Sequence, residues 1–246
     1  MNRTWGPILG LSLMTIGCGA IPGVPGLGEC KFGKGELAAN LTGDAKAFVE
    51  TVLEVQKLQA EWTAEIKAIA GELKVDGTEE AVLAKFKANF ESFKAKGKCT
   101  FDFSADIDLK AQLEASASGK ASSDEGAKGD AAAEGGASAS VNVKIEPKCE
   151  AEADVKADLD VTVNAIKVHM PKLLGVAKGY IAFLAKVPEL TTKGQGLVTQ
   201  LVTDLNAVGE VKCAVETLTG FKADLDAKVD FSVNVQASAK GEAKAG

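Results

Sequence analysis

Paired aspartates in a repeated tetrapeptide are the residues whose types and spacing could do chemistry. The sequence ADLD stands at Ala157–Asp160 and Ala223–Asp226, and the variant ADID stands at Ala105–Asp108. Calcium and other hard cations bind clusters of oxygen ligands, so three converging copies would form a metal site. The candidate ligands are Asp106, Asp108, Asp158, Asp160, Asp224 and Asp226. Lys110, Lys156, Lys222 and Lys228 lie on the same strand faces in this pattern, and cross-strand Asp–Lys pairs would neutralise most of the charge. We therefore expect a solvated charged face rather than a metal site.

Other sequence features of catalytic sites are sparse. The single histidine, His169, lies two residues before Pro171 and has no nucleophile beside it in the sequence. Acyl transfer by a serine or cysteine needs an adjacent base. Sugar sites with paired carboxylates normally carry aromatic platforms, yet Tyr180 is the only tyrosine and Trp62 is the only tryptophan outside the first 17 residues. We expect no enzymatic activity and no cofactor.

Cysteine spacing indicates disulfide bonds. Four cysteines follow Cys18, namely Cys30, Cys99, Cys149 and Cys213. An even number in an exported chain favours disulfides, and the lack of a CxxC pair argues against zinc. The first two and the last two of these cysteines each bracket a segment with helical periodicity. We therefore predict the pairs Cys30–Cys99 and Cys149–Cys213, each closing the base of one helical hairpin.

Composition limits the classes of partner. The 246-residue chain has a formal net charge of −6, and its only arginine is Arg3. Bidentate recognition of phosphate uses guanidinium groups, and nucleic-acid binding uses basic patches. We therefore expect no nucleic-acid partner.

The N-terminus has the organisation of an export signal. Arg3 supplies a positive charge, and Pro7–Ile16 is an apolar segment too short to span a bilayer. The sequence TIGC at Thr15–Cys18 then resembles the lipobox of bacterial lipoprotein precursors, in which the cysteine is acylated and becomes the mature N-terminus. The resemblance implies a signal peptide at 1–17, lipidation of Cys18 and a membrane partner through this lipid anchor. The alternative is an ordinary cleaved secretory signal.

Four amphipathic helices are expected. The first carries a seam of apolar residues in alternating steps of four and three, interrupted once by a glutamine. The seam consists of Phe48, Val52, Val55, Gln59, Trp62, Ile66, Ile69 and Leu73. A second helix is predicted from about Thr78 to Ala95, and a third from about Val168 to Val187, ending at Pro188. The connector ELTTKGQG leads to the fourth helix. That helix presents Leu197, Leu201, Leu205 and Val208 on one face.

Alternation of apolar and polar residues follows the helical segments. It extends over Phe101–Ala117, Ala137–Val163 and Phe221–Ala239. Because period-two alternation places apolar side chains on one face of a strand, we predict three long amphipathic strands. Pro147 would bend or divide the second strand, since proline cannot donate to a β ladder. Gly, Ala, Ser and charged residues dominate 119–136, where we predict a flexible loop.

These elements occur twice in the same order, which indicates an internal duplication. Each unit is a helical hairpin followed by a long amphipathic strand, with repeats at 30–121 and 149–243 inside one domain at 36–246. The lipidated cysteine and a Gly/Pro-rich tether at 18–35 would precede this domain. The predicted fold class is α+β, with the helices packed on an antiparallel sheet.

Two functions are possible, and they differ in what covers the apolar faces of the strands. If the helices cover these faces, the chain is an exported, lipid-anchored cell-envelope protein with a structural or partner-binding role, and we expect an envelope protein as its partner. If strands from several chains form one transmembrane barrel with their apolar faces toward lipid, the chain is a subunit of an oligomeric outer-membrane channel or pore. Lipid-facing strands normally carry aromatic girdles, for which the chain has too few aromatic residues, so the first function is favoured. Gly19 after the lipidated cysteine favours the outer membrane, on its periplasmic or cell-surface side.

Overall fold

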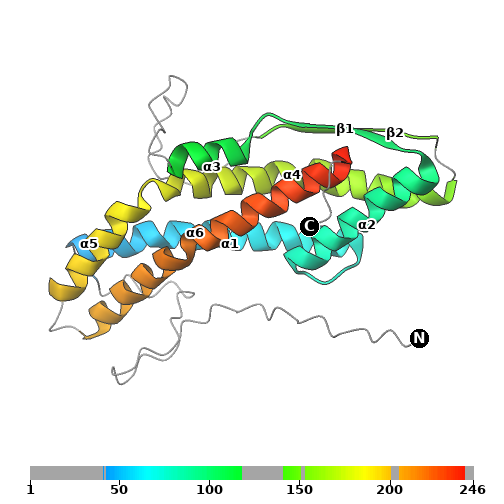
Figure 1. The fold of residues 1–246 in the computed structure, drawn as a ribbon. Coiled ribbons are helices and arrows are strands. Elements are labelled where there is room, and N and C mark those ends of the chain that lie inside the picture. The colour runs from blue at the N-terminus through cyan, green and yellow to red at the C-terminus, as the bar shows by residue number, and fades with distance from the viewer. Residues whose placement is uncertain (1–40, 42, 118–140, 151–152, 201–204, 242–246) are drawn as a thin grey trace, which may run out of the picture.

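The fold is an elongated bundle of helices with a short β-ribbon along one side (Figure 1). The computed structural model describes residues 41, 43–117, 141–150, 153–200 and 205–241. Its helices are α1 (Gly43–Leu73), α2 (Glu79–Gly97), α3 (Leu109–Ala117), α4 (Ala153–Leu184), α5 (Val187–Gln200) and α6 (Leu205–Lys240). Its strands are β1 (Thr100–Ala105) and β2 (Val143–Lys148). The predicted signal peptide, tether and 119–136 loop lie outside the described residues.

The predicted α+β fold class is wrong. Within the described residues, the only sheet has two short strands instead of three long ones. Residues 109–117 of the first alternating range form α3, residues 153–163 of the second belong to α4, and the third range lies wholly in α6. The helices therefore pack on each other, and the described residues do not form a duplicated set of hairpins on a sheet.

Helix α6 shows why the alternation was misleading. Its buried side chains recur in steps of four and three along one helical face. On the stretch predicted as a strand, the buried residues are Phe221, Leu225, Lys228, Val229, Phe231, Ser232, Val235, Ser238 and Ala239. The apolar residues Ala223, Ala227 and Val233 are exposed instead. Because alanine is the strongest helix former, an alternation that uses many alanines does not oppose a helix.

The first two predicted helices are confirmed. Every apolar residue of the predicted seam in α1 is buried, and Gln59, which interrupts the seam, is exposed. The hydroxyl of Thr78 caps α2 by accepting a hydrogen bond from the N–H of Ala81 at 3.2 Å. The three phenylalanines of α2 are buried in the bundle.

The third and fourth helices differ from the prediction in their boundaries. Helix α4 begins at Ala153, well before the predicted start near Val168. The segment ELTTKGQG, predicted as a connector, belongs to α5. Pro188 is the second residue of α5, where proline is tolerated because the first turn's N–H groups have no partner in the helix. Leu205 begins α6, and Leu201 lies outside the described residues.

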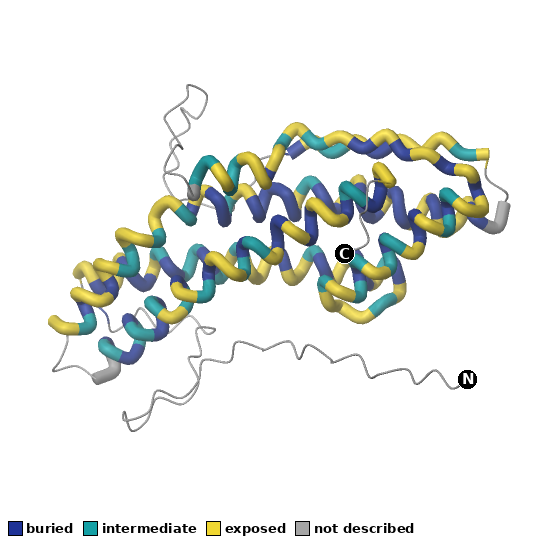
Figure 2. The backbone as a smooth tube through the Cα atoms, viewed as in Figure 1, coloured by how far each residue is buried: buried dark blue, intermediate teal, exposed yellow. Residues whose placement is uncertain are grey.

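The two strands form an antiparallel ribbon that packs against α4 and α6. Phe103 pairs with Ile145, and both side chains are buried, whereas the neighbouring Asp102 and Ser104 are exposed. The predicted alternation is therefore correct over this short ribbon. Figure 2 shows the buried residues gathered where the elements face one another. None of the helices in the described ranges combines the length and apolar character needed to cross a bilayer.

Candidate functional site

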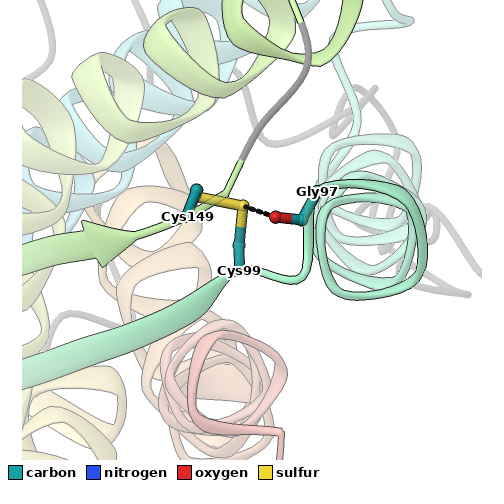
Figure 3. The surroundings of a disulfide bond; sticks show 3 residues. All are labelled: Gly97, Cys99 and Cys149. Atoms are coloured by element: carbon teal, nitrogen blue, oxygen red, sulfur yellow. Dashed lines mark hydrogen bonds between the residues drawn. A yellow bond between two sulfur atoms is a disulfide. The ribbon is translucent and has the colours of Figure 1, made fainter.

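A disulfide joins Cys99 to Cys149 at one end of the ribbon (Figure 3). The strand register explains the pairing, because Thr100 lies opposite Lys148 and the next positions outward are the two cysteines. Their Cα atoms are 4.1 Å apart. Both predicted pairs, Cys30–Cys99 and Cys149–Cys213, are therefore wrong, since strand register and not the helical hairpins brings these cysteines together. Cys213 is also disulfide-bonded, but its partner lies outside the described residues, as do Cys18 and Cys30.

The structure does not bring the six candidate aspartates together. Asp106 accepts hydrogen bonds from the backbone N–H and the side-chain amide of Asn142, at 3.0 and 2.9 Å. Asp108 accepts a hydrogen bond from the N–H of Ala111 at 3.0 Å, at the start of α3. The other four lie on helices, Asp158 and Asp160 on α4, and Asp224 and Asp226 on α6. Across the described ranges, no three His, Cys, Asp or Glu side chains are grouped so that they could hold a metal ion.

His169 lies in a group of charged side chains between α1 and α4. We name Glu65, Glu72, His169 and Lys172 the α1–α4 charge cluster. The Nδ1 atom of His169 is 2.6 Å from Oε2 of Glu65, and its Nε2 atom is 3.2 Å from Oε1 of Glu72. Lys172 Nζ donates to Oε1 of Glu65 at 3.0 Å. Because His169 is only 6% exposed, these contacts are made at the edge of the core.

Glu65 is ionised in this cluster. Burial by itself would raise the pKa of Glu65, but the hydrogen bonds and positive charges of His169 and Lys172 outweigh burial and lower the pKa below its ordinary value of 4.5. Its carboxylate therefore accepts a hydrogen bond from Lys172 and lies within hydrogen-bond distance of His169 Nδ1. This shared carboxylate fastens one turn of α4 to α1.

A second buried group surrounds Lys228. We name Trp62, Tyr180, Asp224 and Lys228 the lysine cluster. Lys228 is 2% exposed and donates to Asp224, one turn earlier in α6. Its ammonium also lies over the rings of Tyr180 and Trp62, 4.9 and 5.5 Å from their centroids. Cation–π attraction and the aspartate together replace the water that an exposed lysine would have.

The aromatic members of the lysine cluster make contacts that involve four helices. Trp62 Nε1 donates to Oε1 of Glu79 at 2.6 Å, and the Tyr180 ring stacks on Phe221 with the centroids 5.1 Å apart. Burial, with the negative charge of Asp224 as a smaller cause, raises the pKa of Tyr180 far above its ordinary value. The tyrosine hydroxyl is therefore neutral. The Asp224–Lys228 pair and the packed rings link α1, α4 and α6, and the Trp62–Glu79 hydrogen bond adds α2.

A shallow cavity of about 270 Å³ lies between α5 and α6. It is lined by Gln195, Val198, Lys212, Val215 and Glu216. No residue of either cluster lines it. The clusters therefore act between helices, where their chemistry is charge neutralisation and hydrogen bonding across a packed interface.

The prediction identified His169 but missed its partners. Glu65 and Glu72 are seven residues apart and therefore lie on the same side of α1, next to its apolar seam. The seven-residue spacing could be recognised in the sequence, but nothing in the sequence showed that α4 packs against this side of α1. Lys228 was predicted on the solvated face of a strand, but it is buried in α6, where it pairs with Asp224 one turn earlier in the same helix.

No protein family matches the chain, and neither a curated protein nor a solved structure matches it.

Proposed function

We propose that the protein is a lipid-anchored component of the bacterial cell envelope with a structural or partner-binding role and no enzymatic activity. The observation that carries this proposal is the sequence TIGC at Thr15–Cys18, directly after a short apolar segment with a positive charge before it. This order of features is that of a lipoprotein leader, in which Cys18 carries the lipid. Gly19 supports placement at the outer membrane, on its periplasmic or cell-surface side.

The sequence after Cys18 suits a spacer between the lipid and the bundle. Residues Gly19–Glu29, GAIPGVPGLGE, are mainly glycine, proline and small apolar residues with one charge at the end. A spacer of this length reaches at most about 40 Å when extended. The folded part would therefore stay close to the membrane surface.

The contacts inside the bundle support a structural or binding role. His169 and Lys172 are engaged by carboxylates of α1, and Lys228 is engaged by Asp224 and two aromatic rings. These polar groups join neighbouring helices, so the bundle can present a defined surface to a partner. The partners of this proposal are the membrane, through the lipid, and another envelope protein. The acidic net charge gives no support to a nucleic-acid partner.

The channel alternative depended on long amphipathic strands. Most of the residues in those ranges are helical in α3, α4 and α6. We therefore propose the tethered bundle alone.

Metabolic labelling tests the lipid anchor. The full chain, produced in a Gram-negative host fed with alkyne-tagged palmitate, should incorporate the label and sediment with the outer membrane. Cys18→Ser should lose the label and appear in the soluble periplasmic fraction. Cys30→Ser, which removes another N-terminal cysteine, should keep the label. Retention of the label in Cys18→Ser, or a mature N-terminus at another residue, would contradict the proposal.

Photo-crosslinking in living cells tests the partner-binding role. Val161 and Val168 are 42% and 43% exposed and lie seven residues apart in α4, so a crosslinking amino acid at either position faces the same surroundings. We expect one protein to be captured from both positions and then to bind the purified chain. The matched control is the same amino acid at exposed Lys57 in α1. Capture from no exposed position would contradict a partner-binding role.

A further inference from the structure

The contacts of His169 define its proton content. Its two ring nitrogens each lie within hydrogen-bond distance of a carboxylate oxygen, at 2.6 Å for Glu65 and 3.2 Å for Glu72. A neutral imidazole has one N–H, and an ionised carboxylate can only accept. Both contacts are therefore satisfied only when the ring carries two protons. In that form the α1–α4 charge cluster has two positive and two negative groups, and its net charge is zero.

The backbone of α4 is weakened at the same place. Pro171 lies inside the helix, two residues after His169 and one before Lys172. Proline has no N–H, so α4 lacks the hydrogen bond that residue 171 would otherwise donate to the carbonyl of Lys167. The α1–α4 charge cluster therefore contacts α4 on both sides of Pro171, through His169 before it and Lys172 after it.

We propose that His169 is a proton-operated latch that holds the Pro171 segment of α4 against α1. While the ring carries two protons, it donates to Glu65 and Glu72 at once. When it loses one proton, one nitrogen becomes an acceptor facing a carboxylate, and the cluster gains a net negative charge at a nearly buried position. The α4 segment then has weaker contacts with α1 and opens more often.

Within the described residues, the side chain of His169 makes its hydrogen-bond and ion-pair contacts with Glu65 and Glu72, both on α1. Helix α2 faces α4 with the uncharged Asn89, which donates to Thr162 at 2.8 Å. The Asp224–Lys228 pair of α6 lies against Tyr180 and Trp62, and Lys228 makes its ion pair with Asp224. The charged residues of α3 and β2 are exposed, namely Lys110, Glu114, Lys144, Glu146 and Lys148. The proton of His169 is therefore coupled to Glu65, Glu72 and Lys172.

The direction of the pH dependence follows from these contacts. Because only the doubly protonated ring can donate to both carboxylates, the latch is complete at acidic pH and is lost as pH rises through the titration of the ring. On the acid side, the lowered pKa of Glu65 keeps its carboxylate ionised until pH falls below its ordinary value of 4.5. His169 is the only histidine, and histidine is the only side chain that ordinarily titrates between about pH 5 and 8.

Nuclear magnetic resonance of the folded full chain tests the proton content directly. Because there is one histidine, a ring 1H–15N correlation of protein labelled with 15N histidine contains a single pair of nitrogen signals. The proposal requires both nitrogens to be protonated at the acidic end of a series from about pH 5 to 8, and one to have lost its proton at the other end. A ring with only one proton throughout this range would overturn the proposal.

Hydrogen exchange tests the opening of α4. After correction for the intrinsic exchange rate, protection of the α4 amides around Pro171 should fall on the order of tenfold between the two pH values, the effect of one lost charge-assisted hydrogen bond. His169→Gln should remove this change. Glu72→Gln should also remove it, because an amide can donate to the neutral ring. An equal fall in the wild type and in both variants would overturn the proposal, and if the variants fail to fold, the ring signals of the wild type decide.

Discussion

The ammonium of Lys228 lies 4.9 Å from the centre of the Tyr180 ring, inside the bundle and out of contact with solvent. A cation at this depth depends on Asp224, which is the only carboxylate contacting it among the described residues. The two members of the pair differ in exposure, since the side chain of Lys228 is 3% exposed and that of Asp224 is 31% exposed. They should therefore respond differently to substitution.

Asp224→Asn should destabilise the protein more than Lys228→Met. The first change leaves a buried ammonium without its counter-charge, which costs about 3 kcal/mol of unfolding free energy. The second change leaves an aspartate that can still reach water, and the methionine keeps the packing against Trp62 and Tyr180, so about 1 kcal/mol or less should be lost. Urea unfolding followed by circular dichroism measures both. Equal losses of unfolding free energy in the two variants would show that buried Lys228 does not depend on the counter-charge of Asp224.

Gly194 in α5 should not tolerate a methyl group. A Cβ atom there would lie 2.5 Å from a methyl carbon of Val215 and 2.6 Å from the ring of Phe48, well inside contact distance. Gly194→Ala should therefore cost about 1–3 kcal/mol by overpacking. Gly196→Ala is the matched control, because nothing lies within 4 Å of its Cβ position, and it should gain about 0.5–1 kcal/mol from helix propensity. Thermal unfolding of both variants gives the sign of each change.

The Cys99–Cys149 disulfide should stabilise the protein measurably. It closes a sequence separation of 50 residues, so the double variant Cys99→Ser/Cys149→Ser should lose about 2–4 kcal/mol. Denaturant unfolding at one pH compares the variant with the wild type. A loss below about 0.5 kcal/mol would contradict the expected constraint on the unfolded chain.

The partner of Cys213 gives an independent test of the lipid anchor. Cys213 is disulfide-bonded, and Cys99 is joined to Cys149, so the remaining cysteines are Cys18 and Cys30. If Cys18 carries the lipid, Cys30 is the partner. Mass spectrometry of unreduced proteolytic peptides should find Cys30 joined to Cys213. Cys18 joined to Cys213 would contradict lipidation of Cys18.

The sequence predicted some helices well because large apolar residues marked their buried faces. In α1 the seam was interrupted only by Gln59, and its other members could not be arranged as an alternating strand. In α6 the buried face contains Lys228 and Ser232, while Val233 is 39% exposed. Lys228 is accommodated by the rings of Trp62 and Tyr180, and Ser232 donates to the carbonyl of Lys228 within α6. A single sequence does not display the contacts between helices.

The candidate site was predictable only in part for the same reason. His169 was identified because it is the only histidine, but its partners Glu65 and Glu72 are 104 and 97 residues away in the chain. Their contact depends on the packing of α1 against α4. The Cys99–Cys149 pair could have been predicted from the sequence with the correct strand register, because that register places these cysteines opposite each other.

The position of that disulfide has a consequence for proteolysis. Residues 43–97, with α1 and α2, precede Cys99, and α4, α5 and α6 follow Cys149. A protease that cuts the chain once between the two cysteines yields fragments that remain covalently joined. Such a nicked molecule would keep all five of these helices attached to one another until a reductant separates them.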